Sequence, residues 1–208
     1  MVQVVDSLFS LYQELDQEIA QFKAHSGLNC RESCGLCCLR PSEEILCTLL
    51  ELIPVARDLF QEGLASLVWE QAQKAGGESR CVFYEPQPES PFAGRCGRYT
   101  VRPLLCRLFG FSGFRDKRSR VLLTASRVMK EDFPEVVKKA QESMDEGLAI
   151  PLSSDWATRL AGIDPSLTQE RMPLNVALMR AIEWVALRWG RDDDTPPNGP
   201  PRVPPQAA

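Results

Sequence analysis

The sequence predicts a mainly α-helical chain with one small β-hairpin and a long loop region. Three observations lead to this prediction. Apolar residues recur at steps of three and four over several long stretches, which is the spacing of one helix face. One pair of apolar runs flanks a short polar segment, as in a hairpin. A middle stretch rich in glycine and proline shows little helical periodicity, so we expect loops there.

The first helix is predicted over residues 5–25, where apolar side chains alternate with acidic ones, and Gly27 should end it. A second helical region should begin at Pro41, with acidic residues in its first turn. Pro54 should break or kink that region, because proline lacks the N–H that a helix interior needs. The glycine pair that begins at Gly76 should end the region.

Residues 80–106 are predicted to be mainly loop with short extended pieces. Arg102 precedes a proline, so its backbone should be extended, and a short helix should begin at Pro103. The β-hairpin is predicted from the apolar runs 109–114 and 121–125 on either side of a strongly basic tip.

Helices should resume over residues 133–144 and around Trp156, and a last helix over residues 173–189 carries a continuous apolar stripe. At 208 residues, one domain is the natural expectation, and we place it over residues 1–190. Residues 191–208 hold six of the sixteen prolines and three consecutive aspartates, which favours a disordered tail.

Charge and hydropathy exclude several functional classes. The formal net charge of −4 gives no signal for nucleic-acid binding. No apolar run approaches the length of a membrane span, so no membrane partner is expected. The N-terminus has neither the basic region nor the cleavage site of a signal peptide. We therefore expect a cytoplasmic location, where thiols stay reduced.

Seven of the eight cysteines form one interlocking pattern of short spacings. Thiolates at such spacings can converge on a soft metal, so the domain is predicted to be built around a cysteine metal centre. The eighth cysteine, Cys47, lies in an apolar stretch and is expected to be a buried thiol. The candidate metal ligands are Cys30, Cys34, Cys37, Cys38, Cys81, Cys96 and Cys106.

The adjacent pair Cys37 and Cys38 sets a geometric constraint. Neighbouring Cα atoms lie about 3.8 Å apart, which is below the usual disulfide span of about 4.4 Å or more. The two residues are therefore not expected to bridge each other. Adjacent side chains also point in different directions. We expect the pair to serve two different centres, or only one of the two to be a ligand.

The cysteine pattern resembles the YkgJ-like cysteine-cluster family, whose members are described as candidate zinc- or iron-chelating proteins. The resemblance covers about residues 28–112 and implies a cysteine-ligated metal, either iron–sulfur or zinc. One branch of the family methylates flagellin lysines, but nothing outside the metal motif points to that branch. The motifs that carry the resemblance are Cys30-x3-Cys34-x2-Cys37-Cys38, Arg80-Cys81 and Cys96-x2-Tyr99-x2-Arg102-Pro103-x2-Cys106-Arg107.

An iron–sulfur cluster or iron is the preferred cofactor, and zinc is the alternative. Seven thiols exceed the four that one zinc ion needs, and only Cys34 and Cys37 form a C-x2-C knuckle. The single histidine, His25, is placed at a helix end rather than among the ligands. An iron–sulfur centre would imply electron transfer or an accessory role in a redox or modifying reaction, whereas zinc would stabilise a protein-interaction module.

The three-cysteine spacing of Cys30, Cys34 and Cys37 is also that of radical S-adenosylmethionine enzymes. Those enzymes need repeated strand–helix units, which this sequence does not predict, so this reading and that of a protein-methylating enzyme are less favoured.

Positive charge is concentrated in residues 95–139, which hold twelve lysines or arginines against four acids. Arg102, Arg107 and Tyr99 lie within the metal motif and are expected beside the ligands, where guanidinium donors would offset thiolate charge. We interpret the rest of this basic segment as a solvated face. The alternative is a docking face for a protein partner.

Overall fold

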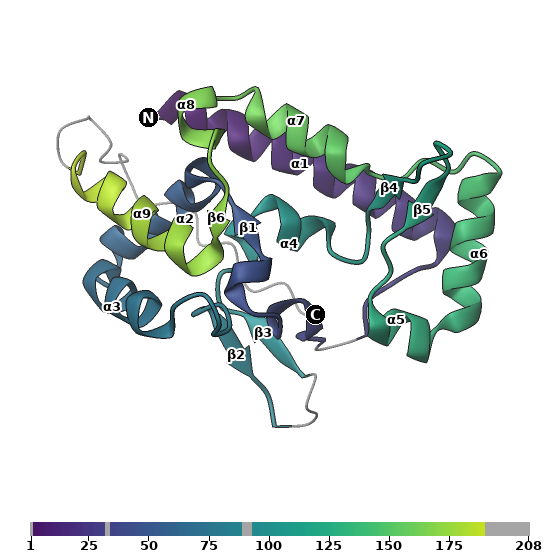
Figure 1. The fold of residues 1–208 in the computed structure, drawn as a ribbon, viewed down its shortest axis with the longest axis horizontal. Coiled ribbons are helices and arrows are strands. Elements are labelled where there is room, and N and C mark those ends of the chain that lie inside the picture. Colours follow the sequence, from purple (N-terminus) through teal and green to yellow (C-terminus); the bar gives the residue numbers. More distant parts are fainter. Residues whose placement is uncertain (1, 32–33, 89–92, 190–208) are drawn as a thin grey trace.

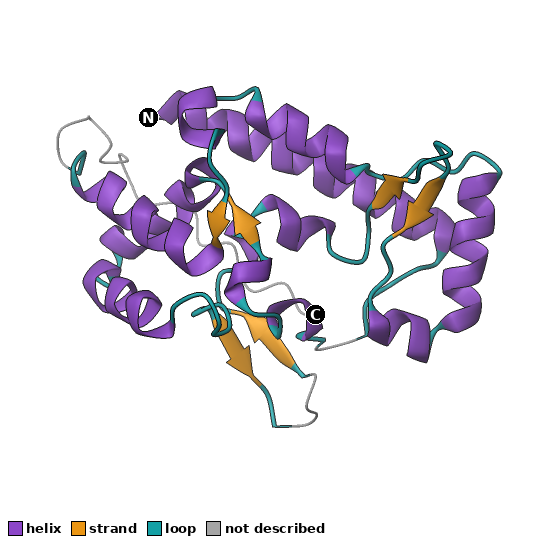
Figure 2. Ribbon diagram, in the orientation of Figure 1, coloured by secondary structure: helices purple, strands orange, loops and turns teal. Residues whose placement is uncertain are grey.

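The computed structural model describes residues 2–31, 34–88 and 93–189 (Figure 1). Within these ranges the chain is mainly helical and its strands are short, as predicted (Figure 2). The predicted tail, 191–208, lies outside the described residues. The helices are α1 (Val2–Ser26), α2 (Leu49–Gln61), α3 (Ala65–Ala75), α4 (Leu104–Leu108), α5 (Arg127–Asp132), α6 (Pro134–Asp145), α7 (Ser153–Ala161), α8 (Pro165–Thr168) and α9 (Leu174–Ala186).

The strands form three antiparallel pairs rather than one. The pair β4 (Gly113–Arg115) and β5 (Val121–Leu123) is the predicted hairpin. It is attached to α6 through Gln141, whose side chain accepts a hydrogen bond from the Leu123 N–H and donates one to the Val121 carbonyl. The other two pairs are only two or three residues long, too short to show an alternating pattern in the sequence. The pairs are β1 (Leu46–Cys47) with β6 (Met172–Pro173), β2 (Tyr84–Pro86) with β3 (Gly94–Cys96), and β4 (Gly113–Arg115) with β5 (Val121–Leu123).

The long helix α1 forms where the sequence predicts it and runs along the long axis of the molecule (Figure 1). Its apolar stripe is fully buried at Leu8, Leu15 and Phe22. The helix stops at Gly27, whose φ of +71° lies in the left-handed region that glycine adopts without steric cost. The Gly27 N–H donates to the Lys23 carbonyl at 2.9 Å, which closes the last turn.

The predicted helix start at Pro41 is wrong. The chain makes only a short 3₁₀ turn over Ser42–Glu44, and α2 begins at Leu49. The later start is stabilised by Glu51, whose carboxylate accepts hydrogen bonds from the backbone N–H and hydroxyl of Thr48 at 2.7 and 2.9 Å. This side-chain pairing outweighs the weaker start signal of the proline and the acidic residues after it.

Of the break or kink predicted at Pro54, the break does not occur. Pro54 lies buried inside α2, where the apolar packing around it offsets the missing backbone hydrogen bond. The break between α2 and α3 comes at Gly63, with a φ of +72°, and α3 ends at Gly76, as predicted.

In the core, α2 and α3 pack against α9 and α1 packs against α2, and we call these four helices the helical body. Leu50, Ile53 and Leu178 are almost completely buried between α2 and α9. Burial of each such side chain contributes about 1.5–3 kcal/mol. The apolar stripe of the predicted last helix is confirmed in α9, which ends at Ala186. None of the helices described combines the length and apolar character required to cross a bilayer.

Candidate metal centre

The seven motif cysteines come from four separate segments of the chain. The first cluster lies on the loop after α1, and its last two cysteines belong to a 3₁₀ turn, η1 (Leu36–Cys38). Cys81 precedes β2, Cys96 ends β3 and Cys106 lies on α4, which Figure 1 places at the centre of the molecule with β3 below it. All seven are free thiols; Cys30 is exposed and the other six are partly buried.

A close approach of backbones holds η1 against β3. The ring of Tyr84 packs on Gly35 and Gly94, and a Cβ on Gly35 would come within 2.9 Å of that ring and 3.1 Å of the Gly94 backbone. Cys34 forms an isolated antiparallel bridge to Ala93, next to the same contact. The absence of side chains at the two glycines therefore allows the first cysteine loop to reach Cys96.

A buried asparagine fixes the loop of Cys81. Asn175, at the start of α9, accepts a hydrogen bond from the Val82 N–H at 3.3 Å. Its amide donates to the carbonyls of Gly76 and Arg80 at 3.0 and 3.1 Å. These three bonds satisfy backbone groups of an irregular segment and attach it to the helical body.

A buried carboxylate positions the helix of Cys106. The second oxygen of Glu51 accepts a hydrogen bond from the Leu104 N–H, at the N-terminus of α4, at 2.8 Å. Burial raises the pKa of Glu51, whereas its hydrogen bonds to Thr48 and Leu104 act in the opposite direction. One side chain thus begins α2 and also fixes the orientation of α4.

Arg107 joins the ligand loop to α1. Its guanidinium forms an ion pair with Asp16 at 2.5 Å and stacks over the ring of Tyr12. The same group donates to the carbonyls of Arg102 and Thr100 at 3.0 and 2.5 Å. Since these contacts use donors on Nε and both terminal nitrogens, Arg107 acts on the cysteines through the backbone of residues 100–102.

The sulfur atoms of Cys37 and Cys38 lie 3.7 Å apart, so the expectation that this adjacent pair would diverge is wrong for the sulfurs. The 3₁₀ turn brings them to the same side of the chain. The Cys38 thiol also interacts with Cys96, which makes it the middle member of three. The hydrogen bonds from Cys38 lower the pKa of Cys37 and of Cys96 to about 7, and they raise the pKa of Cys38 itself.

The remaining motif thiols surround these three. Burial raises the pKa of Cys81 to about 12 and also raises that of Cys106. The negative charges of Cys37 and Cys96 raise both pKa values further. The negative charge of Cys37 also raises the pKa of the Cys30 thiol. Among the described residues, no three His, Cys, Asp or Glu side chains already form an arrangement that would hold a metal ion.

Arg102 presents an unused donor beside the thiols. Its Nε is buried and has no hydrogen-bond partner among the described residues. Its guanidinium stacks on the ring of Tyr99 at 3.7 Å, and its charge lowers the pKa of Cys37 and Cys96. A buried N–H without an acceptor is costly, and anionic sulfur would supply one. The donor set therefore fits a thiolate-bound metal.

Two residues are not among the ligands that the sequence predicts. Cys47 is fully buried, as predicted, and its thiol donates to the Ile45 carbonyl at 3.7 Å. Burial raises the pKa of this thiol, which lies near enough to Cys106 and Cys81 for their charges to raise it further. His25 lies exposed in the last turn of α1, where its ring nitrogen Nδ1 is 2.8 Å from the Gln21 carbonyl oxygen.

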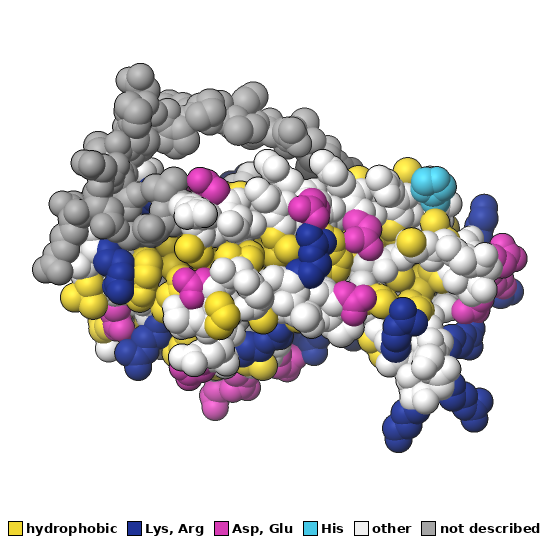
Figure 3. Space-filling model, turned by 90° about the horizontal axis from the view of Figure 1, so that it is seen from above, with side chains coloured by type: hydrophobic (Ala, Val, Ile, Leu, Met, Phe, Trp, Pro, Cys, Tyr) yellow, Lys and Arg dark blue, Asp and Glu magenta, His cyan; other side chains and the backbone are white. Residues whose placement is uncertain are grey.

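Much of the basic segment is neutralised by ion pairs with acids elsewhere in the chain. At the hairpin tip, Lys117 and Arg118 form no ion pair with the residues that the structure describes. Figure 3 shows dark blue side chains gathered at this end of the molecule. The pairs to acids outside the segment are Arg95–Glu85, Arg98–Glu62, Arg107–Asp16, Arg120–Asp145 and Lys138–Glu142.

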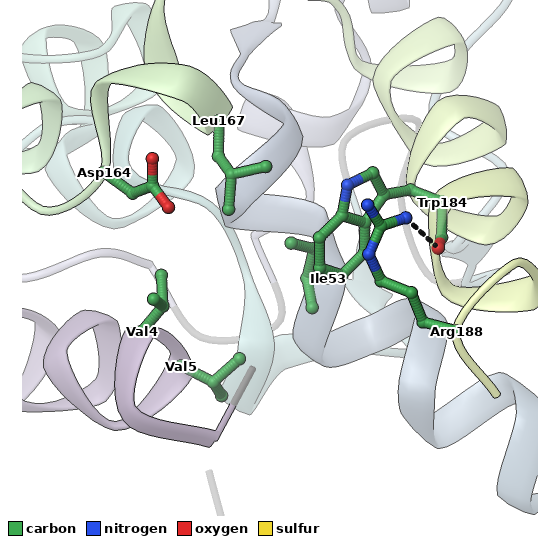
Figure 4. Close-up of a pocket in the computed structure, with 7 residues that line it drawn as sticks. All are labelled: Val4, Val5, Ile53, Asp164, Leu167, Trp184 and Arg188. Atoms are coloured by element: carbon green, nitrogen blue, oxygen red, sulfur yellow. Dashed lines mark hydrogen bonds between the residues drawn. The ribbon is translucent and has the colours of Figure 1, made fainter. Parts of the chain in front are cut away.

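A cavity of about 170 Å³ lies apart from the cysteines, between α1, α2, α8 and α9 (Figure 4). In it the guanidinium of Arg188 stacks over Trp184 and donates to that residue's own carbonyl at 3.2 Å. No cysteine contributes to its walls, so it is not part of the candidate centre. The lining residues are Val4, Val5, Ile53, Asp164, Leu167, Trp184 and Arg188.

Comparison with known proteins supports the motif. Residues 29–142, more than half of the chain, match the CxxCxxCC family, described as "Putative zinc- or iron-chelating domain". The chain therefore belongs to this family, and the resemblance inferred from the cysteine spacing is confirmed. The match extends beyond the cysteine motif into α6. No curated protein and no solved structure matches the chain.

Proposed function

We propose that this member of the CxxCxxCC family binds iron or an iron–sulfur cluster through its cysteines and serves electron transfer or a redox or modifying reaction. The observation that carries the proposal is the gathering of thiols around Cys37, Cys38 and Cys96, next to the unused donor of Arg102. Thiolates are soft ligands that suit iron–sulfur centres and zinc.

The ligands are proposed from the seven motif cysteines. Cys38 interacts with both Cys37 and Cys96, and Cys81 and Cys106 lie near enough to be affected by the charges of Cys37 and Cys96. Metal binding requires deprotonated thiols, and the pKa of about 7 for Cys37 and Cys96 eases that step at neutral pH. A reducing compartment such as the cytoplasm would keep all of them competent.

The surroundings of the cysteines support a redox role. Cys30 is exposed and Tyr99, stacked on Arg102, has 63% of its surface open to solvent, so the centre lies near the molecular surface. Solvent exposure and hydrogen bonds to sulfur set the reduction potential of an iron–sulfur cluster. The basic segment 95–139, which contains part of the centre, is the proposed docking face for a protein partner.

A zinc-stabilised interaction module is the second candidate. The four cysteine segments contain little regular structure, and those of Cys81 and Cys106 are each attached to the helical body by one buried polar residue. A zinc ion would cross-link such segments. Leu105, beside Cys106, and the ring of Tyr99 expose apolar surface there that a partner could cover.

Metal and sulfide analysis of anaerobically purified protein separates the two candidates. The first predicts iron, with acid-labile sulfide where the iron is held in a cluster, and visible absorption that bleaches with dithionite. The second predicts about one zinc or more per chain, no sulfide and no visible bands. A protein that carries neither metal after reconstitution with iron and sulfide, or with zinc, would contradict both.

A further inference from the structure

The separation of the two adjacent sulfurs matches the geometry of two ligands on one ion. In a tetrahedral thiolate site with metal–sulfur bonds of about 2.3 Å, two ligand sulfurs lie about 3.8 Å apart. The sulfurs of Cys37 and Cys38 lie 3.7 Å apart. A disulfide would need about 2.05 Å, so the pair is not approaching a bond. An ion placed against both sulfurs would require little movement of either.

The backbone that produces this separation is fixed by packing. The Cys38 N–H donates to the Gly35 carbonyl at 2.9 Å and closes the 3₁₀ turn. On its other side Gly35 is pressed against the ring of Tyr84 and the backbone of Gly94. The turn is therefore held in place by contacts that involve no sulfur, and the pair is organised before any metal binds.

A third thiol approaches the same point from β3. Tyr84 pairs in register with Cys96, so the ring that supports the turn also lies opposite this cysteine. Cys38 interacts with Cys37 on one side and with Cys96 on the other. Arg102 lies near enough to affect both outer thiols, and its Nε is available to one sulfur acceptor.

We propose that Cys37 and Cys38 are ligands of the same metal ion, with Cys96 as the third thiolate. This inference rests on the proposed function, since it requires that the cysteines bind metal. It assigns the adjacent pair to one centre and leaves Cys30, Cys34, Cys81 and Cys106 for the fourth position or a second centre. Three cysteines on one ion fit zinc or a single iron, whereas each iron of a [2Fe–2S] cluster takes only two cysteines beside its bridging sulfides. In a [4Fe–4S] cluster each of the four cysteines binds a different iron. Two cysteines on one ion would therefore exclude that cluster.

The direct test is a proton–cadmium correlation spectrum of the full-length protein loaded with ¹¹³Cd²⁺. The β-protons of Cys37, Cys38 and Cys96 should all correlate with one cadmium resonance. Correlation of Cys37 and Cys38 with two different resonances, or of only one of them with any, would overturn the inference.

Serine variants test the same point with the native metal. Cys37→Ser and Cys38→Ser should each lose the same ion, and X-ray absorption should show one sulfur fewer in any metal that remains. Cys47→Ser is the matched control and should keep its full metal content, since that thiol points into the core. Circular dichroism checks that each variant is folded. Full metal in Cys38→Ser with loss in Cys37→Ser would overturn the inference while leaving the proposed function intact, whereas a wild-type protein without metal would overturn both.

Discussion

The helical body and the cysteine-bearing segments are stabilised by different forces. In the body, the apolar side chains between α2 and α9 are almost all buried and form part of one continuous core. The cysteine region, which we define as residues 28–40, 79–86 and 93–108, adds Leu28, Leu104 and Leu108 to that core and depends otherwise on a few buried polar contacts. We therefore expect the body to be stable without metal, and a bound metal to add to the stability of the cysteine region.

Removal of a core side chain should produce the largest loss of stability. Leu178 is fully buried in α9, so Leu178→Ala should lower the free energy of unfolding by about 2–5 kcal/mol. Metal bound per folded chain should not change, because the residue contacts the body rather than the cysteines. Urea unfolding and metal analysis measure the two quantities. Loss of metal in the folded variant would show that the two regions are not separable.

Loss of a buried polar contact in the cysteine region should lower both the free energy of unfolding and the metal affinity. Asn175→Ala removes the hydrogen bonds from Asn175 to the Val82 N–H and the Arg80 carbonyl, beside Cys81, and should cost about 1–3 kcal/mol; the Gly76 carbonyl keeps its bond from Ser42. It should also weaken metal binding. Gln141→Ala is the control, because it removes comparable bonds from the β4–β5 hairpin. Equal metal affinity in the two variants, determined by competition with a chelator, would refute the role given to Asn175.

The two regions also differ in how far the sequence alone predicts them. Helices α1 and α9 follow directly from the spacing of their apolar residues, because a local period decides which face is buried. The cysteine motif likewise identifies the ligand candidates. Neither pattern shows that Asn175 supports the Cys81 loop or that Glu51 holds α4, because those partners lie 53 or more positions apart in the sequence. The convergence of Cys37 and Cys38 depends on a 3₁₀ turn that no periodicity indicates.

A smaller effect is expected where Arg102 meets the sulfurs. Arg102→Lys keeps the positive charge and removes Nε, so metal affinity should fall by about tenfold, as for other groups that support metal ligands. Arg95→Lys, at an exposed ion pair with Glu85, is the control and should leave affinity unchanged. An Arg102→Lys protein with wild-type affinity would mean that Nε has no sulfur acceptor.

The most subtle effect concerns the pH dependence of the metal-free thiols. Since hydrogen bonds from Cys38 hold the pKa of Cys37 and Cys96 at about 7, their alkylation by iodoacetamide should rise as the pH increases through 7. In Cys38→Ala both pKa values should move up toward that of an ordinary thiol, so labelling at pH 7 should slow by roughly tenfold. Mass spectrometry identifies the labelled residues. Unchanged labelling rates would show that Cys38 does not stabilise the two thiolates.

Hydrogen–deuterium exchange of the full-length protein, with bound metal and after removal by a chelator, tests the comparison most directly. Metal should increase protection in residues 28–40, 79–86 and 93–108, where backbone amides lie beside the cysteines, and should leave α2 and α9 unchanged. A uniform change along the chain would contradict the account, because it would mean that the helical body also depends on metal. Equal protection of the cysteine region in both states would contradict it as well, since no metal would then be organising those segments.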